Sequence, residues 1–318
     1  FLSKEHSPMF EHSSVSDNAE LNYETLDNII FSQNDINQLK PAKWRLGKDY
    51  HLDNIKKIEN AGKPLKAIAD IRVGFATLKD SVFFVKMRDQ DCVATSKDGV
   101  EFSVEVELTR PAVKVPELRN NSDFLQNKRR IIFPYRKQDG RYMLISEQEL
   151  AEKFPKAYKH LCDSREILES RDKGKKNYGS WFAWARTQGM EALGPKLLTK
   201  TFSKYPSFLL DSSDQLFCNG YSVSPKQATL FEPAVDIQVL QLVLNSKVMY
   251  YYSKLTSFQI EGDYQCYQKN FIEKFGIPHL SEEVCRKLLE IERDQVDNYL
   301  VSLYGLDINQ VLEICEPG

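Results

Sequence analysis

The sequence lacks every motif that marks the common classes of catalytic site. Its 318 residues contain no Gly-rich phosphate loop, no His-Glu-x-x-His zinc motif and no Gly-x-Ser-x-Gly nucleophile elbow. The acidic residues form no cluster with nuclease-like spacing. Glu105 and Glu107 share one face of a predicted strand, which is typical of a solvated sheet surface. We therefore assign no catalytic residue and no metal ligand in this chain.

Cysteine and histidine are few and unpatterned. None of the six cysteines lies in a Cys-x-x-Cys pair, and the five histidines do not recur at the helical spacing of metal ligands. Zinc sites and disulfide scaffolds both need closer or patterned spacing. The sequence predicts free thiols in a reducing cytoplasm.

Long apolar runs are absent as well. No run reaches the roughly 18 residues expected of a membrane-spanning helix, so no membrane partner is predicted. The chain starts at Phe1, without an initiator Met and without the apolar centre of a signal peptide. We expect a fragment of a longer cytoplasmic protein.

The residues that are present predict a folded α+β chain. Its length predicts about two domains. β-branched and aromatic runs fill the middle, Gln138–Gly140 predicts a hairpin turn, and Ser146 with Glu149 predicts a capping box. Val235–Leu255 predicts one long amphipathic helix, and Ser281 is expected to cap a helical C-terminal segment. The predicted fold class is α+β, with a strand-rich centre, flanking helices and a helical C-terminus.

Charge is unevenly spread along the chain. Residues 119–204 contain 19 Lys and Arg but 10 Asp and Glu, whereas residues 281–318 contain 3 and 9. This asymmetry is expected of a protein with a polyanion-binding face. A solvated surface gives the same pattern, so charge alone does not decide between the two.

Two basic stretches are candidates for nucleic-acid contact. Residues 119–137 hold six Lys and Arg and one acid, and residues 171–186 interleave cations with aromatic residues. Phosphates bind Lys and Arg, and bases stack on aromatic faces or are wedged apart by them. The candidate contacts are Arg129, Arg130, Lys173, Lys175, Lys176, Tyr178, Trp181 and Arg186. Trp181 also has the spacing of a core residue.

Six sequence motifs follow one another in a characteristic order. They are KPLKAIADIRVGFATLKDSVFFV, RRIIFPY, FPKAYKHLCDSREILESR, YGSWFAWAR, KLLTKTFSKYPSFLLD with NGYSV, and LQLVLNSKVMYYYSKL followed by Ile277–Pro278. Their order resembles the C-terminal target-recognition (specificity) domain of TaqI-like N6-adenine DNA methyltransferases, including fused Type IIG restriction–modification enzymes. The resemblance covers about residues 48–305, and its motifs are specific as an ordered set rather than singly.

The resemblance implies that the chain binds double-stranded DNA at a specific site. Residues 48–280 would be the recognition domain, residues 1–47 the connection from a missing methyltransferase domain, and residues 281–318 a helical segment. The family's Asn-Pro-Pro-Tyr and cofactor motifs are absent, so AdoMet and the adenine chemistry would belong to that missing domain. The fragment alone is expected neither to methylate nor to cleave DNA, and its source to be bacterial or archaeal.

Under the resemblance, the turn Gly74–Asp80 lies on the DNA-facing side, where Thr77 or Lys79 would touch phosphate. A plain solvent-exposed hairpin is the alternative for this turn. Leu78 stands where the family often has Gly, so a positive-φ turn is not predicted there. The alternative function is that of a protein-interaction or structural module. In that case the acidic C-terminal helices would bind a partner and the basic surface would be incidental.

Overall fold

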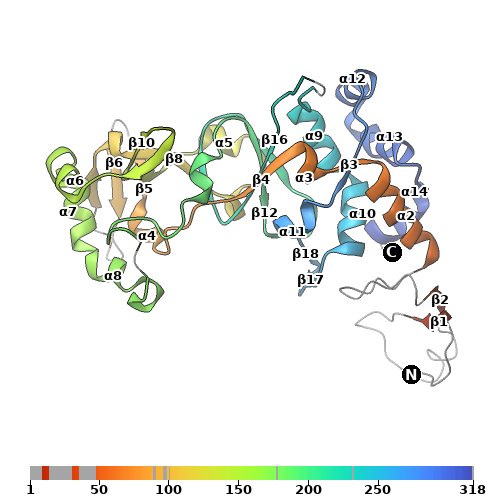
Figure 1. Ribbon diagram of the computed structural model, residues 1–318, viewed down its shortest axis with the longest axis horizontal. Coiled ribbons are helices and arrows are strands. Elements are labelled where there is room, and N and C mark those ends of the chain that lie inside the picture. Colours follow the sequence, from red (N-terminus) through yellow and green to blue (C-terminus); the bar gives the residue numbers. More distant parts are fainter. Residues whose placement is uncertain are drawn as a thin grey trace.

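The computed structural model describes residues 9–13, 31–35, 48–88, 91–95, 99, 101–176, 178–230 and 233–316. It is elongated, with a lobe at each end of a narrower centre (Figure 1). Several mostly antiparallel sheets are combined with helices, which confirms the predicted α+β class. The predicted connection over residues 1–47 falls mostly outside the described residues; its described parts include a short strand pair, β1 (Met9–His12) with β2 (Ser32–Asp35).

The lobe at one end of the molecule is formed by the middle of the chain, residues 75–192 with β15, and we call it the middle lobe (Figure 1). It is built on a six-stranded sheet of order β15-β8-β9-β5-β6-β7. Neighbouring strands are antiparallel except for β15 and β8, which are parallel. Three short helices pack on this sheet through a shared apolar core that includes Leu150, Leu161 and Leu168. The strands are β5 (Phe84–Arg88), β6 (Asp91–Thr95), β7 (Glu101–Val104), β8 (Thr109–Lys114), β9 (Arg129–Ile132) and β15 (Leu216–Cys218), and the helices are α6 (Glu147–Lys153), α7 (Pro155–Asp163) and α8 (Arg165–Glu169).

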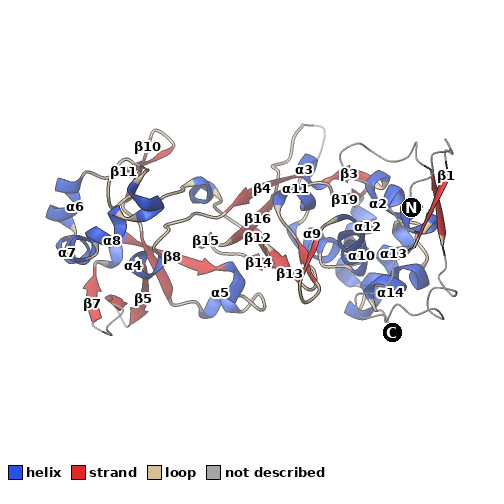
Figure 2. Ribbon diagram, turned by 90° about the horizontal axis from the view of Figure 1, so that it is seen from below, coloured by secondary structure: helices blue, strands red, loops and turns tan. Residues whose placement is uncertain are grey.

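The terminal lobe, residues 48–73 and 196–316 without β15, joins a four-stranded sheet of order β14-β12-β16-β4 to a group of helices. Figure 2 shows these helices gathered at one end of the molecule, with α6 and α7 at the other. The strands are β4 (Ala69–Val73), β12 (Lys196–Lys200), β14 (Phe208–Asp211) and β16 (Gly220–Pro225), and the main helices are α2 (Asp49–Asn60), α9 (Ile237–Leu244), α10 (Lys247–Thr256), α12 (Glu282–Glu290), α13 (Val296–Leu303) and α14 (Ile308–Cys315).

One apolar core holds this lobe together from its first helix to its last. Ile58 of α2, Tyr251 of α10 and Val311 of α14 are all fully buried in it. The helical segment after residue 280 therefore shares its core with α2 and α10. A smaller apolar cluster, including Val115, Leu198 and Phe217, lies between the two lobes and joins them.

The predicted single helix over Val235–Leu255 is wrong, because it is two helices. Asn245 leaves the helix to hold strand β14: its side chain accepts from the backbone N–H of Phe208 at 2.8 Å and donates to the carbonyl of Phe208 at 2.9 Å. Ser246 then caps α10 by accepting from the N–H of Met249 at 3.3 Å. A contact distant in sequence thus overrides a continuous helical pattern.

Candidate nucleic-acid interface

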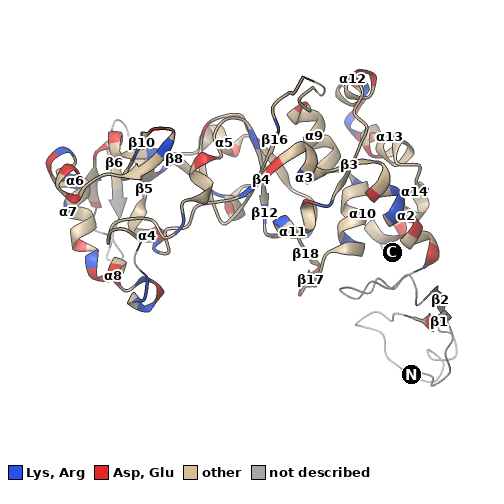
Figure 3. Ribbon diagram, viewed as in Figure 1, with Lys and Arg blue, Asp and Glu red and all other residues tan. Residues whose placement is uncertain are grey.

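A loop with left-handed backbone follows α8 and carries four of the ten predicted contacts. We call Arg171–Lys176 with Tyr178 the basic loop. Asp172, Lys173 and Gly174 have φ of 48°, 60° and 69°, three consecutive residues in the left-handed region. Two of them are not Gly, so the conformation is strained. Lys173, Lys175 and Lys176 are exposed on it, and Figure 3 shows Lys and Arg on this loop just beyond α8, at the bottom of the left-hand lobe.

Arg171 holds the basic loop in this strained shape. Its side chain is 3% exposed, and its guanidinium donates to four backbone carbonyls. These carbonyls belong to Leu168 at 2.8 Å, Thr77 at 3.0 Å, Ala183 at 2.7 Å and Trp181 at 2.7 Å. Burial lowers the pKa of this guanidinium from its ordinary value. One buried cation therefore ties α8, the turn at Thr77 and the chain after the basic loop to one another.

Tyr178 closes the loop from its other end. Its hydroxyl donates to the carboxylate of Asp172, and the Arg171 guanidinium lies 5.0 Å from the centre of its ring. That hydrogen bond lowers the pKa of Asp172, whose carboxylate also lies 3.5 Å from the ammonium group of Lys176. The ring and hydroxyl of Tyr178 are thus engaged within the loop. An adjoining cavity of about 350 Å³ is lined by Arg171, Lys175, Lys176, Tyr178 and Trp181, among others.

Trp181 is partly buried at the edge of the middle-lobe core. The guanidinium of Arg165 lies 4.9 Å from the centre of its ring, and its buried indole N–H has no hydrogen-bond partner in the described part of the chain. The neighbouring Trp184 is 2% exposed and donates to the carbonyl of Ile132 at 3.2 Å. Both tryptophans therefore lie in or against the core.

The turn Gly74–Asp80 joins the basic loop to the rest of the middle lobe. Thr77 is fully buried, and its hydroxyl donates to Asp80 at 2.6 Å, so it shapes the turn rather than facing solvent. A positive-φ turn was not predicted at Leu78, because the residue is not Gly. Leu78 nevertheless adopts φ of 61°, so the turn is present. Lys79 is half-buried beside it. Arg186 is exposed, and its backbone pairs with Ala76 on the same turn.

Arg129 and Arg130 are not brought together, because adjacent strand residues face opposite sides of a sheet. Arg130 donates to the hydroxyl and carbonyl of Thr109 at 2.6 and 2.8 Å and is committed to holding strand β8. Arg129 points to the other face, where it forms an ion pair with Glu117 at 2.7 Å. Arg129 lines a cavity on that face.

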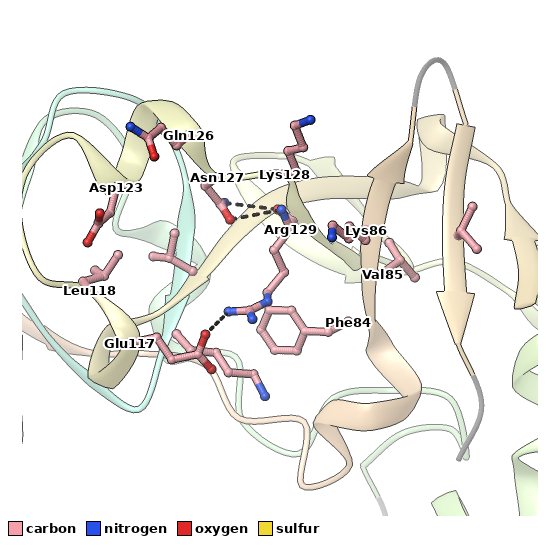
Figure 4. A pocket seen from close by; sticks show the side chains of 13 residues that line it. Phe84, Val85, Lys86, Glu117, Leu118, Asp123, Gln126, Asn127, Lys128 and Arg129 are labelled. Atoms are coloured by element: carbon pink, nitrogen blue, oxygen red, sulfur yellow. Dashed lines mark hydrogen bonds and ion pairs between the residues drawn. The ribbon is translucent and has the colours of Figure 1, made fainter. Parts of the chain in front are cut away.

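That cavity, which we call the junction pocket, has a volume of about 580 Å³. Figure 4 shows Arg129 passing the ring of Phe84 to reach Glu117, with Lys86 and Lys128 nearby. The lining residues are Phe84, Val85, Lys86, Val93, Val113, Lys114, Glu117, Leu118, Asp123, Gln126, Asn127, Lys128 and Arg129. Four cations and two acids among them make the lining net positive.

Lys86, Lys114 and Lys128 were not selected from the sequence. Both Lys86 and Lys114 are placed in the junction pocket by contacts with residues that are distant in sequence. Strand pairing places Lys86, and an ion pair holds Lys114. Lys86 lies opposite Arg129 across β5 and β9, and Lys114 pairs with Asp80 at 3.0 Å. Lys128 lies within the basic stretch of residues 119–137, next to Arg129. This position is the one feature of the sequence that could identify it as a candidate contact. Among the described residues, no group of three or more metal-binding side chains occurs and no helix is long and apolar enough to cross a membrane.

No protein-family model matches the chain. Its sequence is similar to the Type II restriction enzyme and methyltransferase RM.Eco57I of Escherichia coli, with 20% identity over 223 residues, which cover 65% of this chain and 22% of that protein. Its fold is similar to that of the Type IIL restriction–modification enzyme MmeI in a structure with DNA. The TM-score is 0.52 at 13% identity, over 80% of this chain and 36% of that one. The chain is thus similar to parts of two restriction–modification enzymes and spans well under half the length of each.

Proposed function

We propose that this chain is the DNA target-recognition domain of an N6-adenine DNA methyltransferase or restriction–modification enzyme, of the TaqI-like kind. Residues 48–280 would form the recognition domain, and they would bind duplex DNA and read a short site in its groove. A separate methyltransferase domain of the same protein would bind AdoMet and act on an adenine flipped out of the stack.

The observation that carries the proposal is the basic loop. Three exposed lysines stand on a backbone turn that Arg171 and Tyr178 hold in one shape. A preformed loop loses little conformational freedom on binding, so its lysines can contact phosphates at low entropic cost. The similarity to enzymes that act on DNA as restriction–modification systems supports the same assignment.

The parts of the surface would have different roles. Lys173, Lys175, Lys176 and Lys79 would contact phosphates, which position a protein on DNA without reading its sequence. Arg186, exposed beside the turn, has the forked guanidinium that matches O6 and N7 of guanine. Three of the predicted contacts would instead support the fold. Thr77 is buried, Arg130 is hydrogen-bonded to Thr109, and Trp181 packs against the core.

The test is a fluorescence-anisotropy titration of the chain with a random-sequence duplex at several salt concentrations. Each phosphate neutralised by a cation contributes about 0.9 to the slope of log affinity against log salt. Lys175→Ala/Lys176→Ala is therefore expected to lower both the affinity and the slope, the slope by up to about 1.8. The matched control is Lys156→Ala/Lys159→Ala, which removes the same charge from exposed positions on α7.

The control should change the slope much less. Absence of binding at low salt would contradict the proposal, as would equal effects of the two double variants. Binding that is tight but insensitive to salt would instead favour an apolar docking surface for a protein partner.

A further inference from the structure

The junction pocket contains an unfavourable arrangement of charge. Lys86 on β5 and Arg129 on β9 are directly opposite each other in the antiparallel register. Side chains of directly opposite residues lie on the same face, and both of these line the pocket. Like charges in such a pair destabilise the sheet unless something compensates them.

The acids in and around the pocket compensate only part of this charge. Glu117 pairs with Arg129 at 2.7 Å, and Asp80 pairs with Lys114 at 3.0 Å. Asp123 is engaged by its own loop: it accepts from the backbone N–H groups of Arg119 and Asn120 at 2.6 and 3.2 Å, and these bonds lower its pKa.

Two ammonium groups remain without an acid. Neither Lys86 nor Lys128 forms an ion pair within the described part of the chain, and both are exposed at the pocket. In Figure 4 the side chain of Lys128, the residue just before β9, extends away from that of Arg129 at the edge of the pocket. The junction pocket is therefore a concave, positively charged surface, and each acid in or beside it already has a partner.

The pocket also presents an aromatic face that is already covered by cations. Lys114 lies 4.7 Å and Arg129 5.7 Å from the centre of the Phe84 ring. These contacts place two cations beside the Phe84 ring at the base of the pocket. An oxyanion bound by charge fits this lining better than a flat aromatic ligand.

We propose that the junction pocket binds a phosphate group of the DNA backbone through Lys86 and Lys128, with Arg129 beside them. This deepens the proposed function and rests on it. The pocket connects to the basic loop through named contacts: Asp80 holds Lys114, and the carbonyl of Thr77, on the same turn, accepts from Arg171. A duplex bound at the basic loop would thus meet a second cationic surface on the same lobe.

The first test uses inorganic phosphate as the probe. Thermal unfolding of the chain is followed while phosphate replaces chloride at constant ionic strength. The Tm of the unmodified chain should rise with phosphate, because the anion binds only the folded state. Lys86→Met should raise the Tm without phosphate, since it removes the like-charge pair. Lys86→Met/Lys128→Met should reduce the phosphate response to the general stabilisation that this excluded anion gives any folded chain.

The second test asks whether DNA supplies the phosphate. Lys86→Met/Lys128→Met should weaken duplex binding by about tenfold and lower the salt slope by about 0.9, the value for one phosphate. Lys156→Met/Lys159→Met on α7 is the matched control and should leave both quantities close to those of the unmodified chain.

The outcomes separate this inference from the proposed function. Salt-steep DNA binding that is unchanged in Lys86→Met/Lys128→Met overturns the pocket while the recognition role stands. Stabilisation by phosphate without any effect of the double variant on DNA binding shows a site for free phosphate and also overturns the proposal. If the unmodified chain binds no DNA, the recognition role and the pocket's assignment both fail.

Discussion

Replacing Arg171 by Lys should release the basic loop while leaving the middle lobe folded. The Arg171 guanidinium spans four backbone carbonyls at 2.7–3.0 Å, and one of them, that of Thr77, belongs to a distant turn. A lysine has three donors on a single atom and cannot span a fork of this size. At least two carbonyls would lose their partner.

The size of the effect follows from these contacts. Each buried polar group left unpaired costs about 1–3 kcal/mol, so two of them cost about 2–6 kcal/mol. The left-handed backbone of Asp172 and Lys173 stores roughly 1–2 kcal/mol per residue, which favours opening once the clamp is weakened. The apolar core of the lobe does not pass through these residues, so we expect local opening rather than global unfolding.

Limited trypsin digestion measures this opening, because cleavage after Lys173, Lys175 or Lys176 requires the loop to leave its fixed shape. Arg171→Lys should speed cleavage there by more than about tenfold, which corresponds to about 1.4 kcal/mol. Arg110→Lys is the control: Arg110 is a half-buried arginine of the same lobe that donates to Tyr142 at 3.0 Å and pairs with Asp214 at 3.2 Å.

The DNA affinity gives a second readout of the same clamp. Arg171→Lys should weaken DNA binding, and the effect of Lys175→Ala/Lys176→Ala should be much smaller in the Arg171→Lys background, since the lysines are then no longer held in place. Cleavage at the rate of the unmodified chain, or strictly additive effects on affinity, would refute the reasoning.

Three further predictions concern other parts of the chain. Lys196 and Asp211 form a fully buried ion pair at 3.1 Å, so Asp211→Asn should lower the unfolding free energy in denaturant by about 3–5 kcal/mol, and a loss below about 1 kcal/mol would contradict this. Leu78→Gly should leave stability almost unchanged, because relief of a strained φ of 61° offsets the roughly 0.5–1 kcal/mol entropy cost of Gly; a large loss of Tm would show that the turn is not strained. Burial lowers the pKa of His51 below 6.5, so the stability that this histidine contributes is present above about pH 6.5 and is lost as the pH falls toward its folded pKa. The lowered pKa of Glu313 also makes the folded chain less stable as the pH falls. Identical Tm–pH curves for His51→Gln and the unmodified chain would exclude a role for His51.

The features predicted correctly from the sequence depend on neighbours in sequence. Ser146 accepts from the N–H of Glu149 at 3.1 Å and Ser281 from that of Val284 at 3.3 Å, as predicted for N-caps. The Glu149 carboxylate, which would complete the predicted capping box, instead pairs with Arg136 and Lys153. The Asp139–Gly140 turn joins β10 (Tyr135–Gln138) to β11 (Arg141–Leu144), with φ of 50° and 79°. Each of these signals is complete within about four residues.

The features missed depend on contacts between distant residues. The break at Asn245 exists because strand β14 needs a partner for Phe208, and the positive φ of Leu78 is compatible with a turn that Arg171 holds from 94 residues away. The basic loop is identifiable from the sequence because its lysines lie within four consecutive residues. It missed the junction pocket because Lys86 and Arg129 meet only through strand register, which no local pattern specifies.

Duplex DNA bound at the basic loop and the junction pocket would shield the lysines of both. Acetylation of lysines with and without a saturating duplex, quantified by mass spectrometry, tests where DNA lies on the chain. We predict protection of Lys86, Lys128, Lys173, Lys175 and Lys176, with Lys156 and Lys159 on α7 labelled equally in both samples. Protection at α7, or none at the basic loop while DNA is bound, would contradict the account.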